Sequence, residues 1–160
     1  MKILLAVDGS ACSNAAVAAV AARPWPRGTE IKVISAFQLI LPMTPEAWAI
    51  SAQYCDQLEQ IGREQAQTVV NNAAEKIKTA TDPSISVTTS VVIGSPQTAI
   101  LEESEDWKAD LIVVGSHGYS GWQRLLLGSV SLAVVSHAKC SVEVVRCNPA
   151  HEAGETIKAA

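Results

Sequence analysis

The chain has 160 residues, of which 48% are hydrophobic and 18% are charged, so it is long enough to bury the core of one globular domain. Its formal net charge is −4 and it has no cluster of lysines and arginines, which argues against nucleic acid or an anionic membrane as a partner. The apolar run at residues 3–7 is too short for a signal-peptide core or a membrane span, so we expect a cytoplasmic protein.

Short apolar runs alternate with helical patterns along the chain. In chain order they predict strand 3–7, helix 10–22, strand 30–37, helix 45–80, strand 85–93, helix 96–107, strand 111–114, a helix from about 128 to 137, and strand 141–146. This repeat predicts an α/β fold, a five-stranded parallel sheet with helices on both faces. We expect one domain over residues 1–147, followed by a flexible tail at residues 148–160.

The longest predicted helix has an internal glycine and a periodic apolar pattern. Gly62 lies near its middle and is expected to bend or break it. Spacings of mainly four residues predict one buried stripe, made of Leu58, Ile61, Gln65, Val69, Ala73 and Ile77.

The segment between the fourth strand and the last helix, residues 115–131, has the composition of an anion-binding loop. Gly115 and Gly118 allow a ligand close to the backbone and permit positive φ. Gly128 opens the last helix, Ser129 is a candidate N-cap, and Ser131 adds a hydroxyl near the positive end of the helix dipole. A strand, a glycine loop and a helix in this order direct backbone N–H groups toward a phosphate. Neither a P-loop nor a Gly-x-Gly fingerprint is present.

This loop resembles that of the nucleotide-binding branch of the universal stress protein family, in which Gly, two residues, Gly and nine residues precede Gly-Ser or Gly-Thr. Gly115, Gly118, Gly128 and Ser129 match that motif without a gap, and Asp8 matches at the end of the first strand. The resemblance covers nearly the whole chain. It implies a Rossmann-like sheet of order 3-2-1-4-5, similar to the adenine nucleotide alpha hydrolases, with a ligand beyond the carboxyl ends of strands one and four.

The resemblance also implies ATP as the ligand, together with Mg or Mn. The backbone of Ala36 would bind adenine, and the backbones of Val114 and Val130 would lie near ribose and phosphate. The complete expected site is Asp8, Ala36, Val114, Gly115, Gly118, Gly128, Ser129, Val130 and Ser131. For Asp8 two roles stay open: a contact to a ribose hydroxyl or a phosphate-bound metal, or a turn aspartate that caps the first helix.

Other polar residues receive no role in the expected site. His117 is expected to be an exposed loop residue rather than a general base, and Arg124 either reaches a terminal phosphate or is solvated. The acidic residues at 102–106 are expected to form a solvated helix face. The four cysteines contain no Cys-x-x-Cys pair, so neither a zinc site nor a disulfide framework is expected, and Cys140 and Cys147 are expected to be inert thiols.

Three functions fit these observations, and a nucleotide-binding regulatory switch in the stress response fits best. A slow metal-dependent ATP hydrolase is the second, disfavoured because the spacing reveals no base, activating lysine or arginine finger, so at most weak ATPase activity is expected. A nucleotide-free dimeric interaction module is the third, and family members of that kind lack the loop glycines that this chain keeps. We also expect a homodimer through the fifth strand, whose bare edge relatives pair with a second copy.

Overall fold

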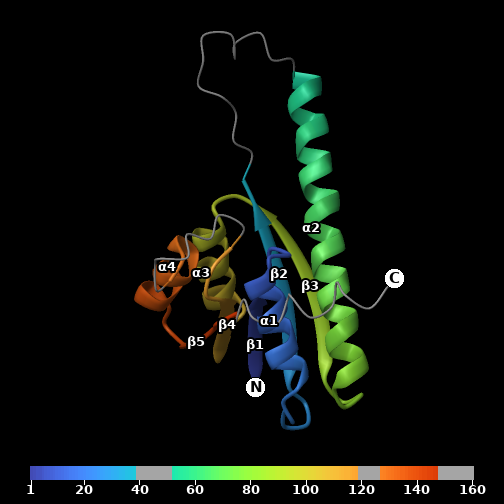
Figure 1. The fold of residues 1–160 in the computed structure, drawn as a ribbon, viewed down its shortest axis with the longest axis vertical. Helices are drawn as coiled ribbons and strands as arrows, with labels where there is room; N and C mark the ends of the chain where they lie inside the picture. Colours follow the sequence, from blue (N-terminus) through green and yellow to red (C-terminus); the bar gives the residue numbers. More distant parts are fainter. Residues whose placement is uncertain (39–51, 119–126, 148–160) are drawn as a thin grey trace, which may run out of the picture.

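The computed structural model describes residues 1–38, 52–118 and 127–147. In chain order its elements are β1 (Lys2–Ala6), α1 (Ala11–Ala21), β2 (Glu30–Phe37), α2 (Ala52–Ala80), β3 (Ser86–Ile93), α3 (Pro96–Asp106), β4 (Leu111–Gly115), α4 (Ser129–His137) and β5 (Ser141–Val145) (Figure 1). The predicted order of strands and helices is confirmed. The predicted first turns of the long helix, at 45–51, and the predicted tail at 148–160 lie outside the described residues.

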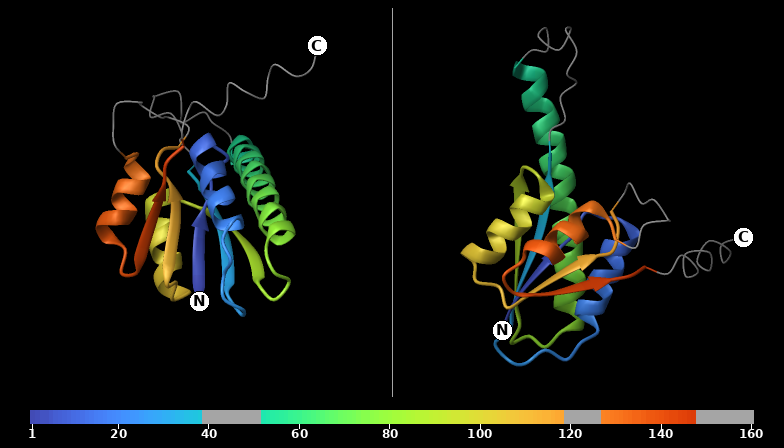
Figure 2. Two further views of the ribbon diagram at one scale, coloured as in Figure 1. Left: turned by 60° about the horizontal axis from the view of Figure 1, so that its bottom comes forward. Right: turned by 90° about the vertical axis from the view of Figure 1, so that its left-hand side faces the viewer.

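The five strands form one parallel sheet of order β3-β2-β1-β4-β5, which confirms the predicted architecture. The chain enters at the centre with β1, winds outward to β3, and then returns to the other side of β1 with β4 (Figure 2). The winding direction therefore reverses between β1 and β4. In open sheets of this kind the space beyond the carboxyl ends of such a strand pair is the usual ligand site.

Helices cover both faces of the sheet, and alternate strand residues point to opposite sides. Leu5 and Val113 pack in a cluster with residues of α1 and α2, whereas Leu4 and Ile112 pack in a second cluster with residues of α3 and α4. All four of these strand side chains have no measurable exposure. Burial on both faces explains why the strands read as continuous apolar runs rather than alternating patterns.

The helix α2 is continuous through Gly62, so a break at this residue is wrong. The glycine is needed for packing, because a Cβ there would lie 2.6 Å from Cε2 of the Phe37 ring. The start of α2 extends past the sheet (Figure 1). The buried residues of α2 are Ala66, Val70, Ala73, Ala74 and Ile77. The predicted stripe is therefore right at Ala73 and Ile77, but it is wrong at Ile61, which is 50% exposed, and at Gln65, which is also exposed, because the buried face passes through the residues beside them.

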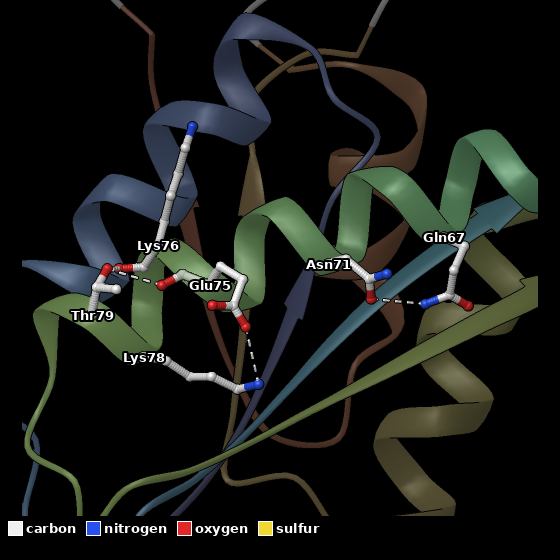
Figure 3. Close-up of polar contacts among 6 residues, drawn as sticks. All are labelled: Gln67, Asn71, Glu75, Lys76, Lys78 and Thr79. Carbon is white, nitrogen blue, oxygen red and sulfur yellow. Dashed lines mark hydrogen bonds and ion pairs between the residues drawn. The ribbon is translucent and has the colours of Figure 1, made fainter.

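The outer face of α2 is polar, and its side chains contact one another along the helix (Figure 3). The amide of Gln67 donates to Asn71 Oδ1 at 2.9 Å, and Lys78 pairs with Glu75 at 3.4 Å. The hydroxyl of Thr79 donates to the carbonyl of Glu75 at 2.9 Å. The two side-chain pairs, at spacings of three and four residues, support a solvated helix face by about 0.2–0.5 kcal/mol each.

Two connections join α1 and the residues after it to β5 and the residues after it. Arg23 makes a bidentate ion pair with Glu143, with both hydrogen bonds 2.5 Å long. Cys12 forms a disulfide with Cys147. The expectation that Cys147 is an inert thiol is therefore wrong. The two cysteines are 135 residues apart in sequence, and the sheet topology brings their Cα atoms to within 4.6 Å of each other. No local sequence motif therefore predicts this disulfide.

Candidate functional site

The candidate site is a cavity of about 520 Å³ at the carboxyl end of the sheet, beyond β1 and β4, the strand pair at which the winding direction reverses. Asp8 follows β1, Gly115 ends β4, and α4 begins nearby with Ser129. The residues lining the cavity are Ala6, Val7, Asp8, Ser13, Ile34, Ala36, Pro96, Ile100, Val114, Gly115, His117, Gly118, Gly128, Ser129, Val130 and Ser131. All nine residues of the expected site line this one cavity.

The carboxylate of Asp8 has one oxygen in the turn and the other at the loop. Its Oδ1 accepts a hydrogen bond from the backbone N–H of Ser10 at 2.9 Å, the short-range contact of a turn aspartate. Its Oδ2 lies 2.7 Å from the position that a Cβ on Gly118 would take. The helix cap itself is Ser10, whose hydroxyl accepts from Ser13 N–H at 3.2 Å. Asp8 therefore supports the turn while its second oxygen lies at the glycine loop.

The loop glycines serve close packing rather than an unusual backbone conformation. Among the described residues, positive φ angles occur at Gly9, Gly28, Gly94 and Lys108, so the positive φ allowed for Gly115 and Gly118 is not used. A Cβ on Gly115 would lie 2.6 Å from the carbonyl carbon of Cys12. Gly115 thus lets the first turn of α1 approach the end of β4.

The start of α4 differs from the prediction in one position. Gly128 is the N-cap, with φ −71° and ψ 163°, and Ser129 is the first helical residue, so Ser129 as N-cap is wrong. A glycine cap offers no side-chain acceptor to the first-turn N–H groups of the helix. These groups lie at a helix end that carries partial positive charge.

Ser131 and Ser116 hold the loop against this helix start. The Ser131 hydroxyl lies 3.0 Å from both the Ser116 and the Gly128 carbonyl oxygens. Gly128 N–H donates to the Ser116 carbonyl at 2.7 Å, and Ser116 N–H donates to the Val145 carbonyl at 2.8 Å. The Ser131 hydroxyl is therefore engaged with the backbone, and it fixes Ser116 and Gly128 relative to the start of α4.

Several lining residues were missed by the sequence prediction. Ile34 of β2 and Pro96 and Ile100 of α3 form an apolar wall of the cavity. The sequence contains a signal for them, because Ile34 belongs to an apolar strand run and Pro96 begins a predicted helix. His117, expected to be exposed, is half-buried and lines the cavity, with Nδ1 3.2 Å from Ser116 Oγ. Arg124 lies outside the described residues.

Comparison with known proteins identifies the family. Residues 1–146 match the universal stress protein family. Universal stress protein A homolog 2 of Coxiella burnetii is 43% identical over 83 residues, which cover 52% of this chain and 53% of that protein, about half its length. A universal stress protein of Bacillus subtilis is 28% identical over 148 residues, which cover 91% of this chain and 98% of that protein.

Solved structures share the fold. Universal stress protein UspA from Lactobacillus plantarum has a TM-score of 0.74 at 26% identity, covering 91% of this chain and 97% of its own. A universal stress protein in complex with cAMP has a TM-score of 0.62 at 22% identity, covering 91% and 96%. A universal stress protein family protein from Arabidopsis thaliana with AMP bound has a TM-score of 0.65 at 16% identity, covering 94% of each chain.

Within residues 1–38, 52–118 and 127–147, no helix has both the length and the apolarity needed to cross a membrane. The sheet order, the cavity at the strand reversal and the match over residues 1–146 agree with one another. The chain belongs to the universal stress protein family.

Proposed function

We propose that this chain binds ATP, with Mg²⁺ or Mn²⁺, in the cavity beyond the carboxyl ends of β1 and β4, and that it acts as a regulatory nucleotide-binding switch in the stress response. The observation that carries the proposal is the convergence of an apolar wall, a glycine loop, an uncapped helix start and a carboxylate in one cavity of about 520 Å³. This volume lies in the range of small-molecule sites. The AMP and cAMP bound to relatives of the same fold support an adenine nucleotide.

Adenine would lie against the apolar wall formed by Ile34, Ile100 and Val114. The backbone of Ala36 is suited to bind its edge. Val7 N–H donates to the Ile34 carbonyl at 2.9 Å, so Ile34 directs its backbone groups toward β1. Because alternate residues of a parallel strand face the same neighbour, Ala36 directs its N–H and C=O to that side too, beyond the end of β1.

The phosphates would lie at the start of α4. Ser129, Val130 and Ser131 contribute first-turn N–H groups without a side-chain cap, and all three residues line the cavity. Gly118 and Gly128 present backbone without side-chain bulk at the same wall. Backbone donors and a helix dipole together form the usual anion site of α/β proteins.

A divalent cation fits the charges of the cavity. Asp8 lines it, and no lysine or arginine does so among the described residues. A triphosphate next to this carboxylate would be repelled unless a cation lay between them. Mg²⁺ is commonly held by one or two carboxylates together with nucleotide phosphates and waters, so Asp8 would supply one protein oxygen, and phosphates and waters would supply the rest.

The proposal includes the assembly and location expected for the whole chain. Residues 1–147 would be the nucleotide-binding domain and 148–160 a flexible tail. Two copies would pair through β5, which lies at one edge of the sheet. A protein of this kind would work in the cytoplasm. No side chain of the described cavity is assigned a catalytic role, and any hydrolysis would be slow.

The deciding experiment identifies the nucleotide. The purified protein is denatured and the released small molecules are measured by mass spectrometry, and the stripped protein is titrated with ATP and Mg²⁺ by calorimetry. Saturation below millimolar ATP is expected, weakened at least about tenfold by Asp8→Ala. Asp56→Ala, an exposed acid on α2, is the matched control and should bind like the wild type.

Absence of both released nucleotide and saturation at millimolar ATP would overturn the proposal in favour of a nucleotide-free module. ADP production that disappears in Asp8→Ala would assign the cavity to a hydrolase instead.

A further inference from the structure

The disulfide between Cys12 and Cys147 lies directly behind the proposed phosphate loop. Cys12 is in the first turn of α1 and is 5% exposed, whereas Cys147, just after β5, is partly exposed. The other two cysteines, Cys55 and Cys140, are free thiols. The bridge therefore joins a buried cysteine to a partly exposed one.

Ser116 contacts one cysteine of this bridge and the strand that leads to the other. Its hydroxyl lies 3.7 Å from the sulfur of Cys12, and its N–H donates at 2.8 Å to Val145, two residues before Cys147. Its carbonyl accepts from Gly128 N–H at 2.7 Å and from the Ser131 hydroxyl at 3.0 Å. Ser116 thus links the disulfide to the residues that begin α4.

The first turn of α1 is also in direct contact with the loop. The carbonyl carbon of Cys12 would lie 2.6 Å from a Cβ on Gly115, so the backbones are packed without spare room. The Ser10 hydroxyl donates to the His117 carbonyl at 3.3 Å. A shift of α1 relative to β5 would therefore move the loop on which the proposed phosphate site depends.

We propose that Cys12 and Cys147 are a reversible thiol–disulfide pair whose oxidised state holds the nucleotide site in its tight-binding form. This inference rests on the proposed function, since it assigns redox regulation to the same cavity. Disulfides in a reducing compartment are usually transient or redox-sensing, which agrees with the cytoplasmic location proposed above.

The chemistry needs a dithiol as the reductant. One of its thiolates attacks the sulfur of Cys147, the more exposed of the two cysteines, forming a mixed disulfide, and Cys12 leaves as a thiolate that takes up a proton. The helix N-terminus around Cys12 favours this anionic leaving group. The second thiol of the reductant then attacks the mixed disulfide and releases Cys147. Two electrons pass to the protein, and the reductant leaves as a disulfide.

The test compares ATP binding in both redox states. Wild-type protein is equilibrated with oxidised or with reduced dithiothreitol, freed of it anaerobically, and titrated with ATP and Mg²⁺. Alkylation after unfolding counts the thiols: two are expected in the oxidised protein, Cys55 and Cys140, and all four after reduction. We expect the reduced protein to bind ATP about three- to tenfold more weakly, because ordering the loop then costs more on binding.

Two variants separate the bridge from general thiol effects. Cys147→Ser should bind with the affinity of the reduced protein in either buffer, and Cys55→Ser combined with Cys140→Ser should keep the full redox response. Circular dichroism checks that each protein is folded.

Four alkylated thiols after oxidation would overturn the pairing. Equal affinities in the two states, alongside the expected thiol counts, would overturn the coupling and leave a purely structural bridge. If neither state binds ATP, the proposed function has failed, and the thiol counts still decide whether the pair forms.

Discussion

The Oδ2 atom of Asp8 lies 2.7 Å from the place where a Cβ on Gly118 would be, so the carboxylate occupies the space of a missing side chain. Asp8, which follows β1, therefore fits against Gly118, which follows β4. Gly118 does not have a positive φ, so the room that it leaves for the Asp8 carboxylate, rather than its backbone conformation, explains why a glycine lies there.

Substituting Gly118 by alanine should therefore act on ATP binding through Asp8. The new methyl group would push the carboxylate out of position and lower ATP affinity about tenfold, or about 1.4 kcal/mol. A double-mutant cycle with Asp8→Ala, measured by calorimetry, tests the mechanism. Once the carboxylate is gone, Gly118→Ala should have little further effect. An equal loss of ATP affinity from Gly118→Ala in the wild type and in Asp8→Ala would contradict a mechanism that acts through Asp8.

Substituting Gly115 by alanine should act on stability instead. Its Cβ would lie 2.6 Å and 2.8 Å from the carbonyl carbon and oxygen of Cys12, and backbone atoms cannot move aside as a side-chain end can. The free energy of unfolding, measured with urea, should fall by about 1–3 kcal/mol. Gly118→Ala is the control, since it meets a side-chain oxygen and should leave the urea midpoint nearly unchanged.

The proposed dimer predicts that proline on the free edge of β5 produces a monomer. Ser116 N–H donates to the Val145 carbonyl, so Val145 faces β4, and by alternation Val144 directs its N–H to the open edge. Val144→Pro removes that donor at a position where an edge strand tolerates proline. Light scattering should show a dimer for the wild type and a monomer for this variant.

A matched variant on the opposite edge controls for general damage. Ser86 N–H donates to Thr29 and Gly94 N–H to Phe37, so the even-numbered residues of β3 face β2, and Thr89 faces outward. Thr89→Pro should remain dimeric. A monomeric wild type, or loss of the dimer in both variants, would contradict pairing through β5.

The Cys140 thiol should react slowly with alkylating reagents. Burial raises the pKa of this thiol, with Asp110 adding repulsion of the thiolate. Because the thiolate is the reactive form, less of it is present at pH 8 than for an ordinary thiol. The iodoacetamide rate, followed by peptide mass spectrometry, should rise with pH around a higher midpoint than in a peptide of residues 138–142. Coincident midpoints would contradict the expected shift.

The order of elements could be predicted because each leaves a local signal. Doubly buried strands are continuous apolar runs, and Pro24 and Pro96 lie near helix boundaries. The strand order and the grouping of Asp8 with the glycine loop came from the resemblance, and the structure agrees with both. Residues in register along β1 and β4 carry no mutual signal in a single sequence, so spacing alone could not pair them.

What escaped prediction depends on contacts between distant segments. Gly62 is explained by the Phe37 ring, a contact that helical periodicity does not contain. Ile61 is exposed because the face of α2 that packs on the sheet passes through Gly62 and Ala66 instead. The bond between Cys12 and Cys147 joins two ends of the chain that only the completed sheet places together. The cap of α4 shifted by one residue because glycine and serine are both good caps, and local sequence does not choose between them.

The cavity takes its walls from β1 near the start of the chain and from α4 near its end. A molecule held there can bind only when both portions are assembled, so unfolding must first release it. Its binding free energy is then added to the global stability and grows with the logarithm of its concentration. In a cell, the resistance of this protein to proteolysis would accordingly increase with the concentration of its ligand, and so would its lifetime.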